Sequence, residues 1–199
     1  MARVKLQNKM EFYDSDDERT FVITPNMVID GKIDHVDIAD AIYVNCSGCT
    51  ELIELPNWPN VKRVICTMNT GLTELPNWQN VTTVYCEDCP MLEELPNWPN
   101  VESVRCNRCI LLKKLPNWQN VAVVSCANCP MLEELPNWPI VKLVNCNRCI
   151  LLRKLPKWQM IEKTYVRGCP GLVYAALVVL IQTEFLLDDL KKECIIWHV

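Results

Sequence analysis

A 20-residue unit repeats in strict phase through most of the 199-residue chain. The copy from Val101 to Asn120 reads VESVRCNRCILLKKLPNWQN, with apolar residues at positions 1, 4, 6, 12 and 15, Cys at position 9, Pro at 16 and Trp at 18. Seven such units, numbered here 1 to 7, run without insertion from Ala41, and the seventh is cut short at Leu172. A period of this length predicts a solenoid, in which each unit buries its apolar residues against its neighbours.

The residues of one unit also predict the path of its backbone. The V-x-x-V-x-C segment is short and rich in β-branched residues, and its apolar side chains alternate as in a strand. Proline at position 16 fixes φ and removes a backbone donor, so it excludes a helix and favours an extended, polyproline-like return. Each unit is therefore expected to contain a strand, a turn and an extended return.

This pattern resembles that of leucine-rich repeats. The family pattern L-x-x-L-x-L-x-x-N/C-x-x-L is matched by Val101, Val104, Cys106, Cys109 and Leu112, and in the six other units. The short period and the L-P-x-W return resemble the compact repeats of bacterial effector proteins, and LPNWPNV-type arrays are similar to repeat proteins of large DNA viruses. The resemblance implies a leucine-rich repeat solenoid with a parallel β-sheet on its concave face, an extended convex side, and protein–protein interaction through the concave face.

The chain is expected to divide into three parts. Residues 1–40 are predicted to be an acidic leader and N-terminal cap, because they carry nine Asp/Glu against five Lys/Arg and alternate around Gly31 as one or two irregular strands would. Residues 41–172 contain the repeats, and residues 173–199 are predicted to form a helical C-terminal cap. The apolar run Leu172–Ile181 is well short of the ~20 residues that cross a bilayer, so a cap is favoured over a membrane anchor.

Thirteen cysteines are the feature that most suggests chemistry. They include five C-x-x-C pairs, and neighbouring pairs match the spacing of a zinc ribbon. However, the same slots hold Asn69 at position 9 and Val166 at position 6, which a ligand set would not tolerate. The favoured interpretation is buried, reduced thiols that act as small apolar residues, with no metal and no cofactor; a thiol or metal carrier is the alternative. Asn69 is also the residue usual in the family at this position, where its amide bonds the turn backbone.

Few features favour catalysis or nucleic-acid binding. The two histidines, His35 and His198, lie in the caps, and a regular stack offers rows of like groups instead of unlike groups that converge, so we expect no catalytic residues. A pI near 5.3 argues against nucleic-acid binding. We read no signal peptide at the N-terminus, which together with reduced thiols favours a cytoplasmic, reducing location.

Charge and internal duplication organise the predicted surface. Positions 13 and 14 are both acidic in units 3 and 5 and both basic in units 4 and 6, which predicts a ladder of opposite charges along one flank. Residues 81–120 and 121–160 are identical at 28 of 40 positions, and eight of the twelve differences fall at positions 2, 3, 5, 7 or 8. Divergence confined to the strand and the following turn is typical of a recognition surface, with relaxed constraint as the alternative.

These diverging positions carry more Arg and Lys than Asp and Glu, together with tyrosines of the kind enriched in binding hot spots. Such a face suits another protein, for example one with an acidic segment. A structural part of a larger assembly, such as a virion, is the main alternative, and the oligomeric state is not predicted. The candidate binding residues are Tyr85, Arg105 and Arg148 first, then Arg108, Arg63, Lys142, Tyr43 and Tyr165.

Overall fold

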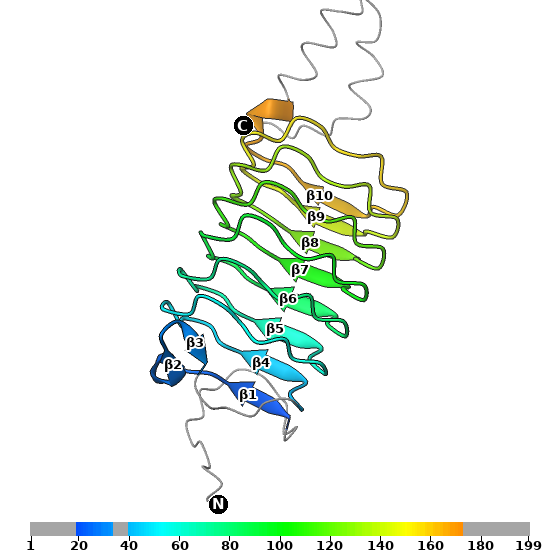
Figure 1. The fold of residues 1–199 in the computed structure, drawn as a ribbon. Helices are drawn as coiled ribbons and strands as arrows, with labels where there is room; N and C mark the ends of the chain where they lie inside the picture. The colour runs from blue at the N-terminus through cyan, green and yellow to red at the C-terminus, as the bar shows by residue number, and fades with distance from the viewer. Residues whose placement is uncertain (1–18, 34–39, 173–199) are drawn as a thin grey trace, which may run out of the picture.

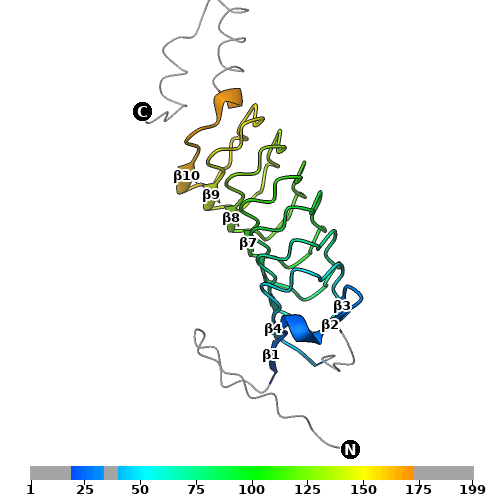
Figure 2. The ribbon, with the colours of Figure 1, turned by 90° about the vertical axis from the view of Figure 1, so that its left-hand side faces the viewer.

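A computed structural model of the chain describes residues 19–33 and 40–172. Within these ranges the repeats stack into a β-solenoid in which each unit makes one turn (Figure 1). Each turn contributes one strand to a parallel sheet on one side, and the extended return runs along the other side (Figure 2). This arrangement confirms the predicted repeat solenoid with a strand, a turn and an extended return in each unit.

The main sheet has eight parallel strands in the order β1-β4-β5-β6-β7-β8-β9-β10. Each repeat strand pairs in register with the residue 20 positions later, as Val84 does with Val104. The strands are β1 (Thr20–Val22), β4 (Tyr43–Asn45), β5 (Arg63–Ile65), β6 (Thr83–Tyr85), β7 (Ser103–Arg105), β8 (Val123–Ser125), β9 (Leu143–Asn145) and β10 (Lys163–Tyr165).

The repeat strands occupy only positions 3 to 5 of the unit, but hydrogen bonds between units continue beyond them. The Cys86 N–H at position 6 donates to the carbonyl of Arg105 at 2.8 Å, and the Asp88 N–H at position 8 donates to the carbonyl of Asn107 at 2.9 Å. The turn after each strand is thus bonded to the turn of the next unit. Because these bonds satisfy backbone groups outside the sheet, the bends at positions 6 to 8 leave few buried groups unpaired.

The core is a set of columns that run the length of the stack. In units 1 to 5 the side chains at positions 1, 4, 6, 9, 12, 15 and 18 are all buried. Unit 7 differs, since Thr164 stands at position 4 where the other units have Val, and it is exposed. The buried columns confirm the predicted inward positions and show that each unit needs a neighbour on both sides to complete its core.

The tryptophans at position 18 form one of these columns, on the return side. From Trp58 to Trp158 successive indole rings stack with centroids 5.8–6.2 Å apart and interplanar angles of 6–11°. The Trp118 Nε1–H also donates to the carbonyl of Pro96 at 3.0 Å, and the same bond recurs in the neighbouring units. Neighbouring strands of a sheet lie only about 4.8 Å apart. The wider spacing on the return side curves the stack so that the sheet lies on the concave face.

The N-terminal cap is more regular than predicted. Strand β1 extends the main sheet by pairing with β4, and the short η1 (Pro25–Met27) leads into a hairpin of β2 (Val28–Ile29) and β3 (Lys32–Ile33). A Cβ added at Gly31 would lie 2.6 Å from Ile53 Cδ1, so the turn of the hairpin packs closely on unit 1. The predicted helical C-terminal cap lies outside the described residues. No helix in the described part of the chain is long and apolar enough to span a bilayer.

Candidate interaction surface on the sheet

The side chains at positions 3 and 5 of β4 to β10 form the outer side of the sheet, which we call the sheet face. Valine at position 4 is fully buried from β4 to β9, so its neighbours at positions 3 and 5 point the other way. These outward residues are partly or fully exposed, apart from Ile65. The sheet face is therefore a continuous surface whose chemistry is set by two residues per turn.

Four predicted binding residues come together on the first half of this face. The guanidinium of Arg63 lies over the rings of Tyr43 and Tyr85, 5.5 and 5.4 Å from their centroids. The guanidinium of Arg105 also lies over the Tyr85 ring, 4.7 Å from its centroid. We call this alternating row, which spans β4 to β7, the Tyr–Arg stack. It consists of Tyr43, Arg63, Tyr85 and Arg105.

The Tyr–Arg stack has the chemistry of an anion-binding surface. A guanidinium that lies over an aromatic ring is held in place by the ring, and its N–H groups remain hydrogen-bond donors. Those N–H groups match the geometry of a carboxylate, to which Arg can bind with two parallel hydrogen bonds. Arg105 is exposed, whereas Arg63 is half-buried with a buried Nε, so Arg105 is the more accessible of the two guanidinium groups on the sheet face. Because the side chains are already ordered, less conformational entropy is lost on binding.

The other four predicted residues do not join this stack. Arg108 lies in the turn after β7 and forms a two-bond ion pair with Asp88, which lowers the pKa of that carboxyl. The Lys142 ammonium lies 3.6 Å from the carboxylate of Glu162. Arg148 occupies the turn after β9, and Tyr165 stands exposed on β10. The predicted set thus divides into the stack and a scattered group near the C-terminal end of the sheet and in its turns.

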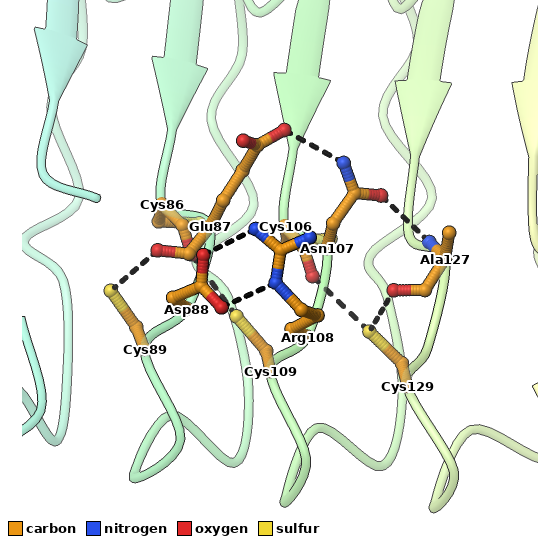
Figure 3. A network of polar contacts seen from close by, with 10 residues as sticks. All are labelled: Cys86, Glu87, Asp88, Cys89, Cys106, Asn107, Arg108, Cys109, Ala127 and Cys129. Atoms are coloured by element: carbon orange, nitrogen blue, oxygen red, sulfur yellow. Dashed lines mark hydrogen bonds and ion pairs between the residues drawn. The ribbon is translucent and has the colours of Figure 1, made fainter. Parts of the chain in front are cut away.

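The turns after the strands carry a polar network of their own (Figure 3). The Asn107 amide donates to the Glu87 carboxylate at 2.7 Å, and its oxygen accepts from the backbone N–H of Ala127 at 2.8 Å. In this way one side chain at position 7 connects three successive units. These bonds use up polar groups that would otherwise be available to a partner, so the turns contribute mainly to the rigidity of the sheet face.

Position 8 of the unit has a backbone requirement that our sequence analysis missed. Its residues adopt the left-handed conformation in every unit, including Met68 (φ 59°), Arg108 (φ 60°) and Arg148 (φ 58°). Glycine adopts this conformation readily, and Asn and Asp tolerate it, whereas long side chains are strained there. The signal was present in the sequence, since the same position holds Gly48 and Gly168.

The inward cysteines are hydrogen-bond donors, which refines the prediction that they act as small apolar residues. The Cys109 Sγ–H donates to the carbonyl of Cys86 at 3.1 Å, and the thiols at position 9 of units 3, 5, 6 and 7 make the equivalent bond. The thiol at position 9 thus satisfies a buried carbonyl at position 6 of the preceding unit. The twelve described cysteines are buried and free.

Asn69 departs from the contact that the family resemblance implied. It is fully buried at position 9, where its amide N–H donates to Cys46 Sγ at 3.7 Å instead of to the turn backbone. Its Oδ1 has no hydrogen-bond partner among the described residues. No group of three or more potential metal ligands comes together in residues 19–33 and 40–172.

Comparisons with known proteins add little beyond the fold. No protein-family model matches the chain, and no curated protein sequence matches it. Among solved structures, a leucine-rich repeat protein from Bacteroides ovatus ATCC 8483 is similar at 14% identity and a TM-score of 0.28, over 77% of this chain and 59% of that one. The chain therefore spans less than two thirds of that protein's length. The strands and turns described above define the chain as a leucine-rich-repeat-like β-solenoid of about seven turns.

Proposed function

We propose that this protein is a non-enzymatic scaffold that binds an acidic segment of another protein on its concave sheet face. The observation that carries the proposal is the Tyr–Arg stack, in which two guanidinium groups are positioned by aromatic rings on an accessible surface. Tyrosine and arginine are among the side chains enriched in the few residues that dominate binding energy at protein interfaces. An acidic segment is the matching ligand because carboxylates pair with guanidinium groups through charge-assisted hydrogen bonds.

The duplicated halves of the repeat array support this assignment. All four outward strand positions differ between residues 81–120 and 121–160, while the buried columns are the same in both. In the first half, residues 81–120, position 5 carries Tyr85 and Arg105. The equivalent residues in the second half are Ser125 and Asn145. A surface that changes while its support stays constant is what selection for recognition produces.

The proposed setting is a cytoplasmic, reducing one, and the partner is a protein instead of a nucleic acid or a membrane. Buried thiols that donate hydrogen bonds are consistent with a reducing compartment. The similarity of the LPNWPNV arrays to viral repeat proteins makes a virion-associated role one form of this proposal. Metal carriage is less favoured, since position 9 thiols already donate their protons to backbone carbonyls.

The test is a titration with a defined peptide. A fluorescein-labelled peptide of about twelve residues, rich in Glu, is titrated with the protein and its anisotropy is followed, alongside the same peptide with Gln in place of Glu. We expect the acidic peptide to bind and the Gln peptide to bind at least tenfold more weakly, with both the affinity and the difference falling as salt is added.

Variants locate the site. Arg105→Gln and Arg63→Gln remove one guanidinium each, and each is expected to weaken binding of the acidic peptide about tenfold, the loss for one charge-assisted hydrogen-bonded pair. The matched control is Lys163→Gln, which removes a positive charge from the same face at β10, outside the stack. Equal loss in all three variants, or equal binding of the Glu and Gln peptides, contradicts the proposal.

A further inference from the structure

A second surface, on the flank of the solenoid, is apolar in units 3 to 6 and polar in units 1 and 2. Positions 10 and 11, which follow the buried position 9, carry Pro-Met in units 3 and 5 and Ile-Leu in units 4 and 6. Met91, Ile110, Met131 and Ile150 are 40–50% exposed. Exposed apolar residues that form a row with polar borders mark interaction sites, whereas single ones are ordinary.

Charged residues border this row on the return side. At positions 13 and 14, the side chains of units 3 and 5 are Glu, and those of units 4 and 6 are Lys or Arg. They pair along the stack, with the Lys113 ammonium 2.6 Å from the Glu93 carboxylate and Lys154 3.5 Å from Glu134. These side chains are 57–73% exposed, so they also face outward. We call positions 10, 11, 13 and 14 of units 3 to 6 the flank.

The flank is complementary to itself under one symmetry operation. If a second copy is placed on it by a two-fold axis that lies in the interface, perpendicular to the solenoid axis and level with the junction between units 4 and 5, the two solenoids run antiparallel. Unit 3 then faces unit 6 of the other copy, and unit 4 faces unit 5, with each position opposite the same position. Every acidic pair therefore faces a basic pair, and every Pro-Met faces an Ile-Leu.

Position 8 follows the same rule in one of its two facing pairs. Asp88 of unit 3 comes opposite Arg148 of unit 6, while Arg108 of unit 4 comes opposite the uncharged Asn128 of unit 5. A two-fold axis parallel to the solenoid axis would instead reverse the order of positions across the interface, so the charged positions 13 and 14 would face the apolar positions 10 and 11. A parallel arrangement offset by one unit has the same reversed order, leaves an unmatched unit at each end and continues as an open chain.

We propose that the flank is a homodimer interface, occupied by a second copy of this chain in the antiparallel, two-fold arrangement. The apolar row supplies burial, and the alternating charges supply register and direction, because a shift by one unit brings like charges together. Four units make a short interface, at the small end of those that give specific complexes, so we expect the dimer to form at micromolar concentrations. This surface is separate from the sheet face.

The experiment uses two complementary variants of the full chain. The acidic-flank variant carries Lys113→Glu, Lys114→Glu, Arg153→Glu and Lys154→Glu. The basic-flank variant carries Glu93→Lys, Glu94→Lys, Glu133→Lys and Glu134→Lys. Mass is measured by sedimentation equilibrium up to about 100 µM, where even a weak interface is populated. We expect the wild type to form a dimer, each variant alone to be monomeric, and an equimolar mixture of the two variants to form a mixed dimer.

Controls separate this result from misfolding and from nonspecific charge effects. Glu51→Lys with Glu74→Lys changes exposed charges in units 1 and 2, outside the flank, and should dimerise like the wild type. If a charge variant fails to fold by circular dichroism, Ile110→Gln with Met131→Gln carries the test, since it keeps every flank charge and should be monomeric. A monomeric wild type, open-ended growth, or dimerisation of the variants that equals that of the wild type would overturn the proposal.

Discussion

The buried columns and the sheet face of this solenoid are built from the same repeats, but they follow opposite rules. Inside, position 18 is always Trp from Trp58 to Trp158, and the ring contacts the next ring in the same way each time. Outside, each of β4 to β7 carries one Tyr or Arg at position 3 or 5, whereas β8 and β9 carry none. The difference shows that register and stability are set by the interior, which leaves the outer side free to vary.

The first prediction tests that separation with the largest expected effect. Trp118→Ala removes an indole that stacks on both sides and donates to Pro96, so it should lower the free energy of unfolding by about 3–5 kcal/mol. Tyr85→Ala, on the sheet face, should lower it by less than about 1 kcal/mol. Urea unfolding of both variants measures the difference.

The end of the column provides the control. Trp58 stacks only on Trp78 among the described residues, so Trp58→Ala should cost less than Trp118→Ala. Equal costs for Trp118→Ala and Tyr85→Ala would show that the face contributes to stability as much as the interior does.

The second prediction concerns the interior thiols and pH. The thiol of Cys129, at position 9 of the next unit, and burial both raise the pKa of Cys106 well above its ordinary value. The unfolded chain therefore releases this proton first, so the stability that the thiol contributes is present below pH ~8.5 and is lost as the pH rises beyond it. Above that pH the free energy of unfolding of the wild type should fall as the pH rises. In Cys106→Ala this fall should be shallower by about 1.4 kcal/mol per pH unit.

Urea unfolding at several pH values between neutral and alkaline measures this slope. Lys163→Gln, which changes only the sheet face, should leave the slope near that of the wild type. A Cys106→Ala slope that matches the wild type would mean that the thiol does not titrate on unfolding.

The third prediction has the smallest expected effect and applies to the turns that join interior and face. Met68 has φ 59° and an exposed side chain, so Met68→Gly relieves backbone strain and should stabilise the fold by about 0.5 kcal/mol after the entropy cost of Gly. Asn128→Gly is the matched change at a residue that tolerates this conformation, and its effect should be closer to zero. Thermal unfolding of both variants ranks them, and destabilisation by Met68→Gly would contradict the argument.

Most of the fold could be predicted because periodicity acts at every level. A fixed 20-residue spacing brings like residues together, so the columns of Val, Leu, Cys and Trp and the alternating Glu and Lys pairs could be read from the chain. The geometry of single contacts could not. The bond from Cys109 to the Cys86 carbonyl depends on where the turn places the sulfur, and the left-handed backbone of Arg108 shows in the sequence only as glycines at the same position in other units.

The site was predicted only in part for a related reason. All four residues of the Tyr–Arg stack were among the candidates. They form one row because Arg63 at position 3 of β5 makes a diagonal contact with Tyr85 at position 5 of β6. Side chains that lean along a strand can meet diagonally, which a position-by-position alignment does not reveal. Arg108 had the right charge and exposure, yet its ion pair with Asp88 gives it a structural partner within the chain.

The regular spacing of the tryptophans has an optical consequence. Six indoles with nearly parallel rings, each about 6 Å from the next, lie close enough for their electronic transitions to couple. Light absorbed by one ring is then shared along the column, and the near-ultraviolet circular dichroism reflects the array as a whole. Separation of any one ring from its neighbours would alter that spectrum, so the solenoid contains its own spectroscopic reporter of whether successive turns remain stacked.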